Sequence, residues 1–274
     1  MTPAIAFGID AGFPMPLAVS LRSVLEKWNK DLPLEIFVLH AKLPAKTREK
    51  VVASLPTTAK AKLQWINVDL DKVAGLPAGG HYSSASYFRL LVPELLPAEI
   101  GAALYLDADT VALTDLSALF ALYEDKFAAQ ACLDTLGSIG NPALKLTSPE
   151  SLGLRHNSPY YNTGVLLMNL KRWRKEKFGT KILEFGRKNP NTLTFASHLV
   201  TNLCISAEIG KLPSEWNAQT GKPKTAGIST LPQDLNRAKI LHYSSEVKPW
   251  SSGRALPEAA AFKEIVARTE WAPK

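Results

Sequence analysis

The sequence predicts one α/β domain with a Rossmann-like, mostly parallel central sheet and helices on both faces. Short apolar runs alternate along the chain with segments whose apolar residues recur every three or four positions, as strands and amphipathic helices do. A repeated order of strand, helix and strand places successive strands parallel in one sheet. The chain has 274 residues, which suits a single large domain, and no linker is recognisable.

The first half of the chain predicts a βαβαβαβ order. Each strand is a short apolar run, and the expected strands are residues 5–9, 34–39, 63–68 and 102–106. The helices between them carry apolar residues on one face and are expected at residues 17–28, 45–55 and 84–95. Ligands of such a sheet bind at the carboxyl ends of its strands.

The second half continues the alternation less regularly. Further strands are expected at residues 127–133, 164–168 and 238–243. Helices are expected at residues 196–207 and 258–269, and residues 170–188 predict one helix, or two with a break at Gly179. Residues 214–232 are rich in Pro, Gly, Thr and Lys, which predicts a loop that could cover a site.

The composition is that of an ordinary globular protein, with 46% hydrophobic and 21% charged residues. No apolar stretch reaches the roughly 20 residues of a membrane-spanning helix, and the N-terminus opens into a strand rather than a signal peptide. Cys132 and Cys204 lie in apolar segments without metal-ligand spacing, so core thiols in a reducing compartment are expected. These features predict a cytoplasmic protein.

The net charge of +7 favours anionic partners such as phosphates, anionic lipids or nucleic acid, without choosing among them. The densest basic segment is residues 171–177 (KRWRKEK), where Trp173 interrupts the charges. Mixed basic and aromatic residues suit a membrane interface or stacking on bases. The favoured alternative is a solvated helix face whose tryptophan packs inward.

Two carboxylates stand at the end of the expected strand 102–106. Residues i and i+2 of a strand point to one face, so Asp107 and Asp109 can hold one divalent cation while Ala108 points the other way. The triplet alone is weak, because most such pairs are solvated loop carboxylates. Other polar residues follow the remaining strand ends, and these are Asp10 between Gly8 and Gly12, Asn162 before Gly164, His242, and Lys248 six residues further on.

Each of these side chains also has a structural interpretation. Asp10 could cap the following helix, Asn162 could satisfy a turn, and His242 and Lys248 could be an ordinary structural histidine and a surface lysine. Taken together they predict a site. Two carboxylates and an imidazole suit Mn²⁺ better than Ca²⁺, with Mg²⁺ tolerated, and a lysine nearby suits a diphosphate.

Five segments in order resemble glycosyltransferase family 8, which includes bacterial lipopolysaccharide galactosyl- and glucosyltransferases and glycogenin. They lie within residues 5–250 and read FGIDAGF, SYFRL, LYLDADT, YNTGVLLMNLKRW and HYSSEVKPW. The resemblance implies a GT-A fold over residues 1–274, with a donor-binding part at about 1–135 and an acceptor-side, metal-completing part at about 136–274. It also implies a nucleotide-diphosphosugar donor, usually UDP-linked, a Mn²⁺ ion and retention of anomeric configuration.

The resemblance assigns a role to each matching position. Asp107, Asp109 and His242 match the metal ligands, and Lys248 matches the lysine that holds the diphosphate. The remaining donor-side matches are Gly8 and Asp10 at the uridine, Arg89 at the donor, Ala108 within the Asp-x-Asp motif, Ser245 beside the diphosphate, and Asp134 and Asn162 beside the donor sugar.

One segment departs from the family pattern. Where members usually carry Asp-Gln-Asp, this chain, aligned on Asn202, reads Ser197-His198-Leu199. The family's aspartate binds sugar hydroxyls and its glutamine lies close to the anomeric carbon. Ser197 can still exchange hydrogen bonds, while His198 could replace the amide or become cationic and oppose a positively charged transition state.

The function expected from these features is metal-dependent, retaining transfer of a hexose from a UDP-sugar to a glycan or lipid-linked acceptor. A nucleotidyltransferase shares the topology, but the segment GIDAGFPMP lacks its Gly-rich, basic signature. A catalytically silent sugar-nucleotide-binding or scaffold protein of the same fold is the main alternative, favoured by residues 197–199. No nucleic-acid partner is expected, peripheral contact with the anionic inner membrane face is open, and the oligomeric state is undetermined.

Overall fold

The computed structural model describes residues 2–57, 60–77, 83–146, 149–190, 196–220, 233–245, 247–251 and 257–273. Its strands are β1 (Ala4–Ile9), β2 (Leu34–His40), β3 (Ala61–Asn67), β4 (Ala102–Asp107), β5 (Thr110–Ala112), β6 (Ala129–Ser138), β7 (Pro159–Asn169), β8 (Ile209–Lys211), β9 (Ala218–Gln219) and β10 (Ile240–His242). Its α-helices are α1 (Pro14–Lys27), α2 (Ala45–Ala53), α3 (Val92–Leu95), α4 (Ser117–Phe120), α5 (Leu170–Glu176), α6 (Phe178–Lys188), α7 (Ala196–Ile205) and α8 (Ala260–Val266).

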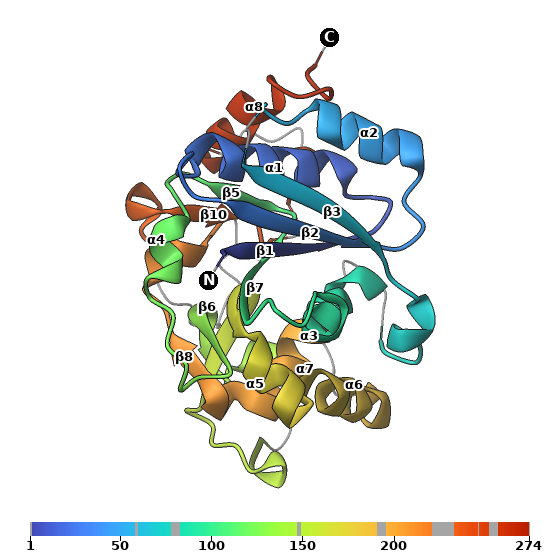
Figure 1. The fold of residues 1–274 in the computed structure, drawn as a ribbon. Coiled ribbons are helices and arrows are strands. Elements are labelled where there is room, and N and C mark those ends of the chain that lie inside the picture. Colours follow the sequence, from blue (N-terminus) through green and yellow to red (C-terminus); the bar gives the residue numbers. More distant parts are fainter. Residues whose placement is uncertain are drawn as a thin grey trace.

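Within these residues, the central sheet has seven strands in the order β3-β2-β1-β4-β7-β6-β8 (Figure 1). All neighbouring pairs run parallel except the two that include β7, which is antiparallel to both β4 and β6. Sequential βαβ units explain the parallel half, because each helix carries the chain back to the same end of the sheet. The predicted fold class, a mostly parallel α/β sheet, is confirmed.

The sheet is buried on both faces. Ile5, Phe7 and Ile9 of β1 pack into one core with α1, whereas Ala4 and Ala6 of the same strand pack into the other. This alternation follows from the period of two along a strand. Figure 1 shows α1, α2 and α8 on one side of the sheet and α3, α5, α6 and α7 on the other. Helices on both faces are therefore confirmed.

A second, small sheet joins two distant parts of the chain. Its order is β5-β10-β9. β10 pairs antiparallel with β5, where His242 faces Thr110, and parallel with β9, where His242 faces Gln219. This pairing carries His242 to the turn that follows β4. The strand predicted at residues 238–243 is present, but nothing in its sequence indicated this partner.

Two expected helices differ from the prediction. Residues 84–95 do not form one α-helix. Ser84–Leu91 is a 3-10 helix, and the short α-helix α3 follows it. Pro93 separates the two helices, since its ring has no N–H to donate to the carbonyl of Arg89 and would clash with that carbonyl in a continuing α-helix. The break in residues 170–188 lies at Lys177, which has a φ of 55°, and not at Gly179.

Gly179 instead permits close packing. A Cβ at this position would lie 2.4 Å from the carbonyl oxygen of Leu90. The glycine is needed for contact between α6 and the 3-10 helix Ser84–Leu91, rather than for a helix end.

β7 is longer than predicted and irregular at its centre. Asn162 pairs with Cys132 of β6 and Leu166 pairs with the preceding residue, Ala131, so residues 163–165 have no partner on β6. Such a bulge redirects side chains locally. Of the loop predicted at residues 214–232, Ser214–Asn217 forms a 3-10 helix that leads into β9, and residues 221–232 lie outside the described residues.

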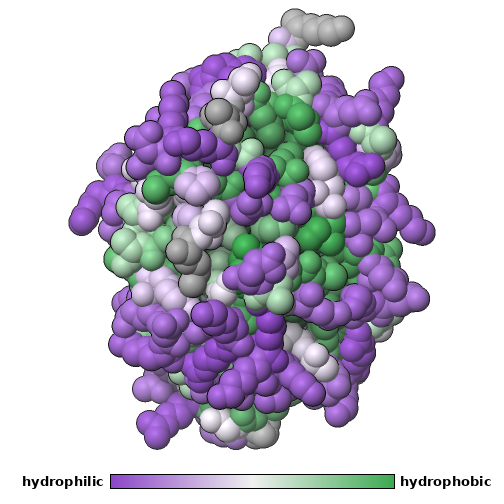
Figure 2. Space-filling model, viewed as in Figure 1, coloured by the Kyte–Doolittle hydropathy of each residue, from purple (hydrophilic) through white to green (hydrophobic). Residues whose placement is uncertain are grey.

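The basic segment 171–177 is largely structural. Trp173 is 1% exposed and its indole N–H donates to the carbonyl of Ala128, which confirms the inward-packing interpretation. Arg174 donates to five backbone carbonyls between Pro93 and Ile100. Lys171, Lys175 and Lys177 remain exposed. Hydrophilic residues cover most of the face shown in Figure 2.

The structure bears on two of the predictions from composition, those on membrane-spanning segments and on the cysteines. Among the described residues, no helix combines the length and apolarity needed to cross a membrane. Cys132 is buried, Cys204 is half-buried, and neither forms a disulfide. Burial raises the pKa of the Cys204 thiol to about 12, as expected for an unreactive core thiol.

Candidate functional site

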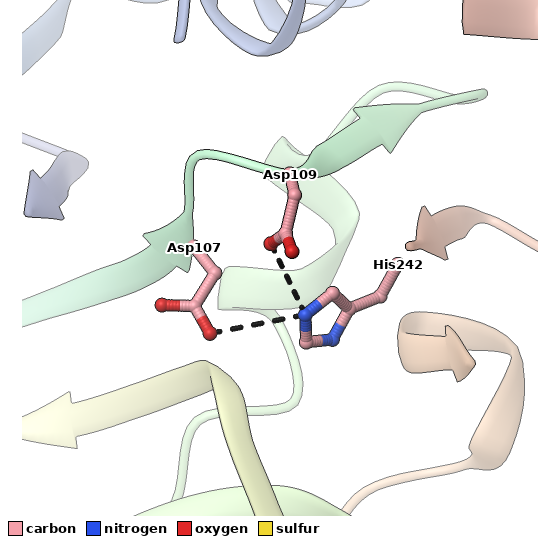
Figure 3. Close-up of side chains that lie close together, drawn as sticks. All are labelled: Asp107, Asp109 and His242. Atoms are coloured by element: carbon pink, nitrogen blue, oxygen red, sulfur yellow. Dashed lines mark ion pairs between the residues drawn. The ribbon is translucent and has the colours of Figure 1, made fainter. Parts of the chain in front are cut away.

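Asp107, Asp109 and His242 lie together at the carboxyl end of β4 (Figure 3). One possible ligand atom from each falls within 4.8 Å of the others. His242 Nε2 is 3.3 Å from Asp109 Oδ1 and 3.8 Å from Asp107 Oδ2. Asp107 ends β4, Asp109 lies in the turn to β5, and β10 brings in His242. Two hard oxygens and one imidazole nitrogen fit a divalent metal such as Mn²⁺ or Mg²⁺.

Gly164 forms the floor of this cluster. A Cβ on Gly164 would lie 2.3 Å from His242 Cε1 and 2.5 Å from Asp107 Oδ2. Only a residue without a side chain allows both ligands to approach β7 this closely. The groups that approach Gly164 are the candidate metal ligands themselves.

Asp107 is held from behind by a buried cation. Arg89 donates through Nη2 to Asp107 Oδ1 at 2.8 Å, and the Tyr105 hydroxyl donates to the same oxygen at 3.1 Å. Burial lowers the pKa of the Arg89 guanidinium, but Asp107 and Tyr105 raise it more, and the net pKa lies above the ordinary value. Arg89 is therefore a permanent cation that leaves Asp107 Oδ2 facing His242.

Lys248 is paired with the second carboxylate. Its ammonium donates to Asp109 Oδ2 at 2.6 Å and to the carbonyl of Tyr243 at 2.5 Å. Burial raises the pKa of the Asp109 carboxyl, but Lys248 and His242 lower it more, and the net pKa is well below the ordinary value. Asp109 is an anion at neutral pH. Ser245, 7% exposed, donates to the carbonyl of Val247 nearby in sequence.

A chain of amides extends from His242 into the protein. His242 Nδ1 is 2.9 Å from Asn217 Oδ1, and Asn217 donates to Asn162 Oδ1 at 3.0 Å. Asn162 donates in turn to Asp134 Oδ2 at 3.0 Å and to Gln219 Oε1 at 3.2 Å. All of these side chains are buried. Asp134 and Asn162 are thus connected through Asn217 to His242, a candidate metal ligand.

His198 of α7 lies near the Asp107 carboxylate. Asn202 anchors this helix, because its side chain exchanges hydrogen bonds with both the N–H and the carbonyl of Tyr161 on β7. His198 Nδ1 then lies 3.2 Å from the Thr163 nitrogen, and its Nε2 lies 3.9 Å from Asp107 Oδ2. Ser197 is fully buried, and its hydroxyl has no hydrogen-bond partner among the residues that the structure describes.

The other predicted residues border the cluster. Gly8 of β1 pairs with Asp107 of β4, which places Asp10 at the neighbouring strand end. Asp10 Oδ1 accepts from the N–H of Gly12 at 2.7 Å, a turn contact rather than a helix cap. Ala108 is buried in the core on the α1 side, opposite to the carboxylates, as predicted.

Sequence reasoning assigned no role to several residues of the site. Thr163, Asn217 and Gln219 link the predicted residues, and Tyr105 supports Asp107. Thr163 lies inside the recognised run YNTGVLLMNL, so its neighbours were the available signal. Asn217 and Gln219 fall in a segment without periodicity, and only their positions in space reveal them.

The sequence of this chain is similar to those of known glycosyltransferases. The sequence model of glycosyl transferase family 8 matches residues 4–253. A lipopolysaccharide 1,2-glucosyltransferase of Escherichia coli K12 is 26% identical over 97% of this chain and 78% of its own length. A lipopolysaccharide 1,3-galactosyltransferase of Salmonella typhimurium is 24% identical over the same shares.

Solved structures share the fold. An active-site mutant of LgtC superimposes with a TM-score of 0.79 at 22% identity, covering 99% of this chain and 98% of the other. The galactosyltransferase LgtC in complex with donor and acceptor sugar analogues gives a TM-score of 0.77 at 21% identity with the same coverage. The chain therefore belongs to glycosyl transferase family 8, has the GT-A fold and is a glycosyltransferase.

Proposed function

We propose that this glycosyltransferase moves a hexosyl group from a UDP-sugar to a glycan or lipid-linked acceptor, with retention of configuration and with Mn²⁺, or Mg²⁺ in its place. The cluster of Asp107, Asp109 and His242 carries the proposal, since its ligand atoms lie within 4.8 Å of one another. The named relatives act on lipopolysaccharide, and LgtC binds donor and acceptor sugar analogues. Those names support the acceptor class.

In this proposal different residues bind the diphosphate, the uridine and the sugar of the donor. Asp107, Asp109 and His242 would hold a divalent metal, which would supply positive charge to the diphosphate. Lys248, now on Asp109, adds a second positive charge as the diphosphate leaves. Gly8 and Asp10 lie at the strand end expected to receive the uridine. Asp134, Asn162, Ser197 and His198 would face the sugar, and Ser245 would allow the phosphates to approach. The side chain of Ala108 packs into the core on the α1 side, so a donor contact at Ala108 would use its backbone.

Retention is proposed to follow the direct route, in which the acceptor hydroxyl attacks the face that the diphosphate leaves. Its proton passes to a diphosphate oxygen. A double displacement needs a nucleophile below the anomeric carbon. Residues 197–199 contain no carboxylate to serve as one. The division into a donor part at 1–135 and an acceptor part at 136–274 stays a prediction, and Asn162 already contacts Asp134 across it.

Donor hydrolysis tests the proposal most directly. The purified protein is incubated with a panel of UDP-sugars, with Mn²⁺ and with a chelator, and released UDP is measured. Mn²⁺-dependent release from one or a few donors supports the transferase and names its donor. No release from any donor, together with retained UDP binding, would favour the scaffold alternative, which the replacement of Asp-Gln-Asp by Ser197-His198-Leu199 also favours.

Lys248→Ala is expected to lower kcat by on the order of 10²-fold with a smaller change in donor KM, because the ammonium acts on charge that develops in the transition state. Steady-state kinetics measure both constants. Lys248→Arg keeps a cation and is the matched control. If Lys248→Ala lowers the thermal stability so far that the protein is unfolded at the assay temperature, Lys248 is a structural residue instead.

Ser197→Asp with His198→Gln is expected to change the donor preference, because these substitutions restore the acidic sugar ligand and the amide usual in the family. Relative kcat/KM values across the UDP-sugar panel measure the change, and each single variant separates the two contributions. An unchanged donor ranking in the double variant would show that residues 197 and 198 do not contact the sugar.

Cytoplasmic localisation and contact with the anionic inner membrane face stay predictions. Lys171, Lys175 and Lys177 are the exposed residues of the basic segment that such contact would use.

A further inference from the structure

We propose that Asn217 and Thr163 are positioning residues that give the two histidines beside Asp107 opposite neutral tautomers. His242 then presents a bare Nε2 to a metal, whereas His198 presents an Nε2–H. The inference deepens the proposed metal site and rests on it for its functional meaning. Its physical basis is the direction of hydrogen bonds that end at groups whose donor or acceptor character is known.

The side-chain amide of Asn162 has one defined orientation. The backbone N–H of Gly164 can only donate, and it lies 3.0 Å from Asn162 Oδ1. The Asn162 amide nitrogen consequently faces Asp134 Oδ2, an acceptor, at 3.0 Å. Both ends of the Asn162 amide therefore agree on one orientation.

Asn217 transmits this orientation to His242. Because Asn162 Oδ1 is an acceptor, the group of Asn217 that lies 3.0 Å from it is the amide nitrogen. Asn217 Oδ1 then faces His242 Nδ1 at 2.9 Å, so that Nδ1 carries the proton. The lone pair of Nε2 is left toward Asp109 and Asp107. An N–H donated to a second residue is the usual way in which a metal-binding histidine is oriented.

Thr163 imposes the opposite tautomer on His198. The backbone N–H of Thr163 donates to His198 Nδ1 at 3.2 Å. The Thr163 hydroxyl accepts from Arg89 Nη1 at 3.0 Å, and its own hydrogen is directed to His198 Nδ1, also at 3.0 Å. Two donors on Nδ1 leave no place for a proton there, so the neutral ring carries it on Nε2.

The two histidines therefore have different chemistry. His198 Nε2–H lies 3.9 Å from Asp107 Oδ2, too far for a hydrogen bond, and could donate to an oxygen of a bound donor. Metal binding through His198 Nε2 would require its proton to move to Nδ1, against two donors. Asn217 and Thr163 are both 0% exposed, so water cannot replace either partner.

Nitrogen-15 NMR of the imidazole rings tests the assignment in the full chain without metal or nucleotide. The pH is set about two units above the ordinary histidine pKa of ~6.5, so that neutral rings are observed. Spectra of His242→Gln and His198→Gln identify the two rings among the five histidines of the chain. We expect a protonated Nδ1 for His242 and a protonated Nε2 for His198. The same tautomer in both rings, or the reverse assignment, would overturn the proposal.

Variants test the positioning residues. Asn217→Leu is expected to remove the single tautomer of His242 and to weaken Mn²⁺ binding in the presence of UDP by about 10- to 100-fold, measured by electron paramagnetic resonance of free Mn²⁺. Asn217→Asp keeps an acceptor for Nδ1–H and should keep the tautomer. Asn189→Leu removes an amide at the end of α6 as the matched control. Unchanged tautomer and Mn²⁺ affinity in Asn217→Leu would refute the role of Asn217.

Thr163→Val removes one of the two donors to His198 and should broaden its tautomer population without altering that of His242. An unaltered His198 spectrum would refute the role of Thr163. The tautomers are read from the wild-type spectrum without metal, so a variant of Asn217 or Thr163 that fails to fold leaves the inference testable. Only the assignment of the two rings needs His242→Gln and His198→Gln. The predicted tautomers without Mn²⁺ binding would refute the proposed metal site alone.

Discussion

Asp109→Asn is expected to abolish Mn²⁺-dependent binding of UDP and to lower kcat/KM by on the order of 10³-fold. The substitution removes one of two charged oxygen ligands, and a bound metal supplies several kcal/mol of charge stabilisation in such transfers. Asparagine keeps the shape of the side chain, which is half-buried between His242 and Lys248. Titration calorimetry with UDP, in the presence and absence of Mn²⁺, measures the binding.

Asp69→Asn is the matched control, because Asp69 caps the 3-10 helix Leu70–Val73 and contributes nothing to the cluster. It should leave the Mn²⁺ dependence unchanged. If Asp109→Asn binds UDP with the same gain from Mn²⁺ as the wild type, then Asp109 is not a metal ligand.

Gly164→Ala should be comparably damaging although it adds one methyl group. The new Cβ would overlap His242 Cε1 and Asp107 Oδ2, and a separation below 3 Å forces one of them to move. Either movement takes a ligand out of the cluster, so kcat/KM and Mn²⁺ affinity should fall together, by on the order of 10²- to 10³-fold. Kinetics and Mn²⁺ titration measure the two effects.

Gly210→Ala separates this effect from general strain in the sheet. A Cβ on Gly210 of β8 would lie 2.4 Å from the Phe127 ring, and Phe127 is not a residue of the site. Gly210→Ala should therefore lower thermal stability with Mn²⁺ affinity intact. Normal Mn²⁺ affinity in Gly164→Ala would mean that the ligands can relax away from β7 and that the glycine is not required.

The sequence by itself determined seven of the ten described strands, the two-sided sheet and the carboxylates at a strand end, and it did not predict β5, β8 or β9. These features are local. Apolar runs identify β1 and β4 because burial on both faces leaves few polar positions, and the spacing of Asp107 and Asp109 places both on one side of the strand end. The recognised segments added His242 and Lys248, and both lie at the cluster. Local patterns failed near Pro93 and at Lys177. At both places the backbone interrupts a helix although the apolar pattern continues.

Only the tertiary structure decided how these groups meet. The pairing of β5 with β10 joins Thr110 to His242, and no periodicity within either strand specifies a partner so distant in sequence. The bulge in β7 places Thr163 against His198 and Gly164 beneath the ligands. Asn217 lies in a segment without a regular pattern, yet its amide orients His242. Hydrogen-bond direction is a property of neighbours in space, so the chemistry of each histidine becomes readable only once the chain is folded.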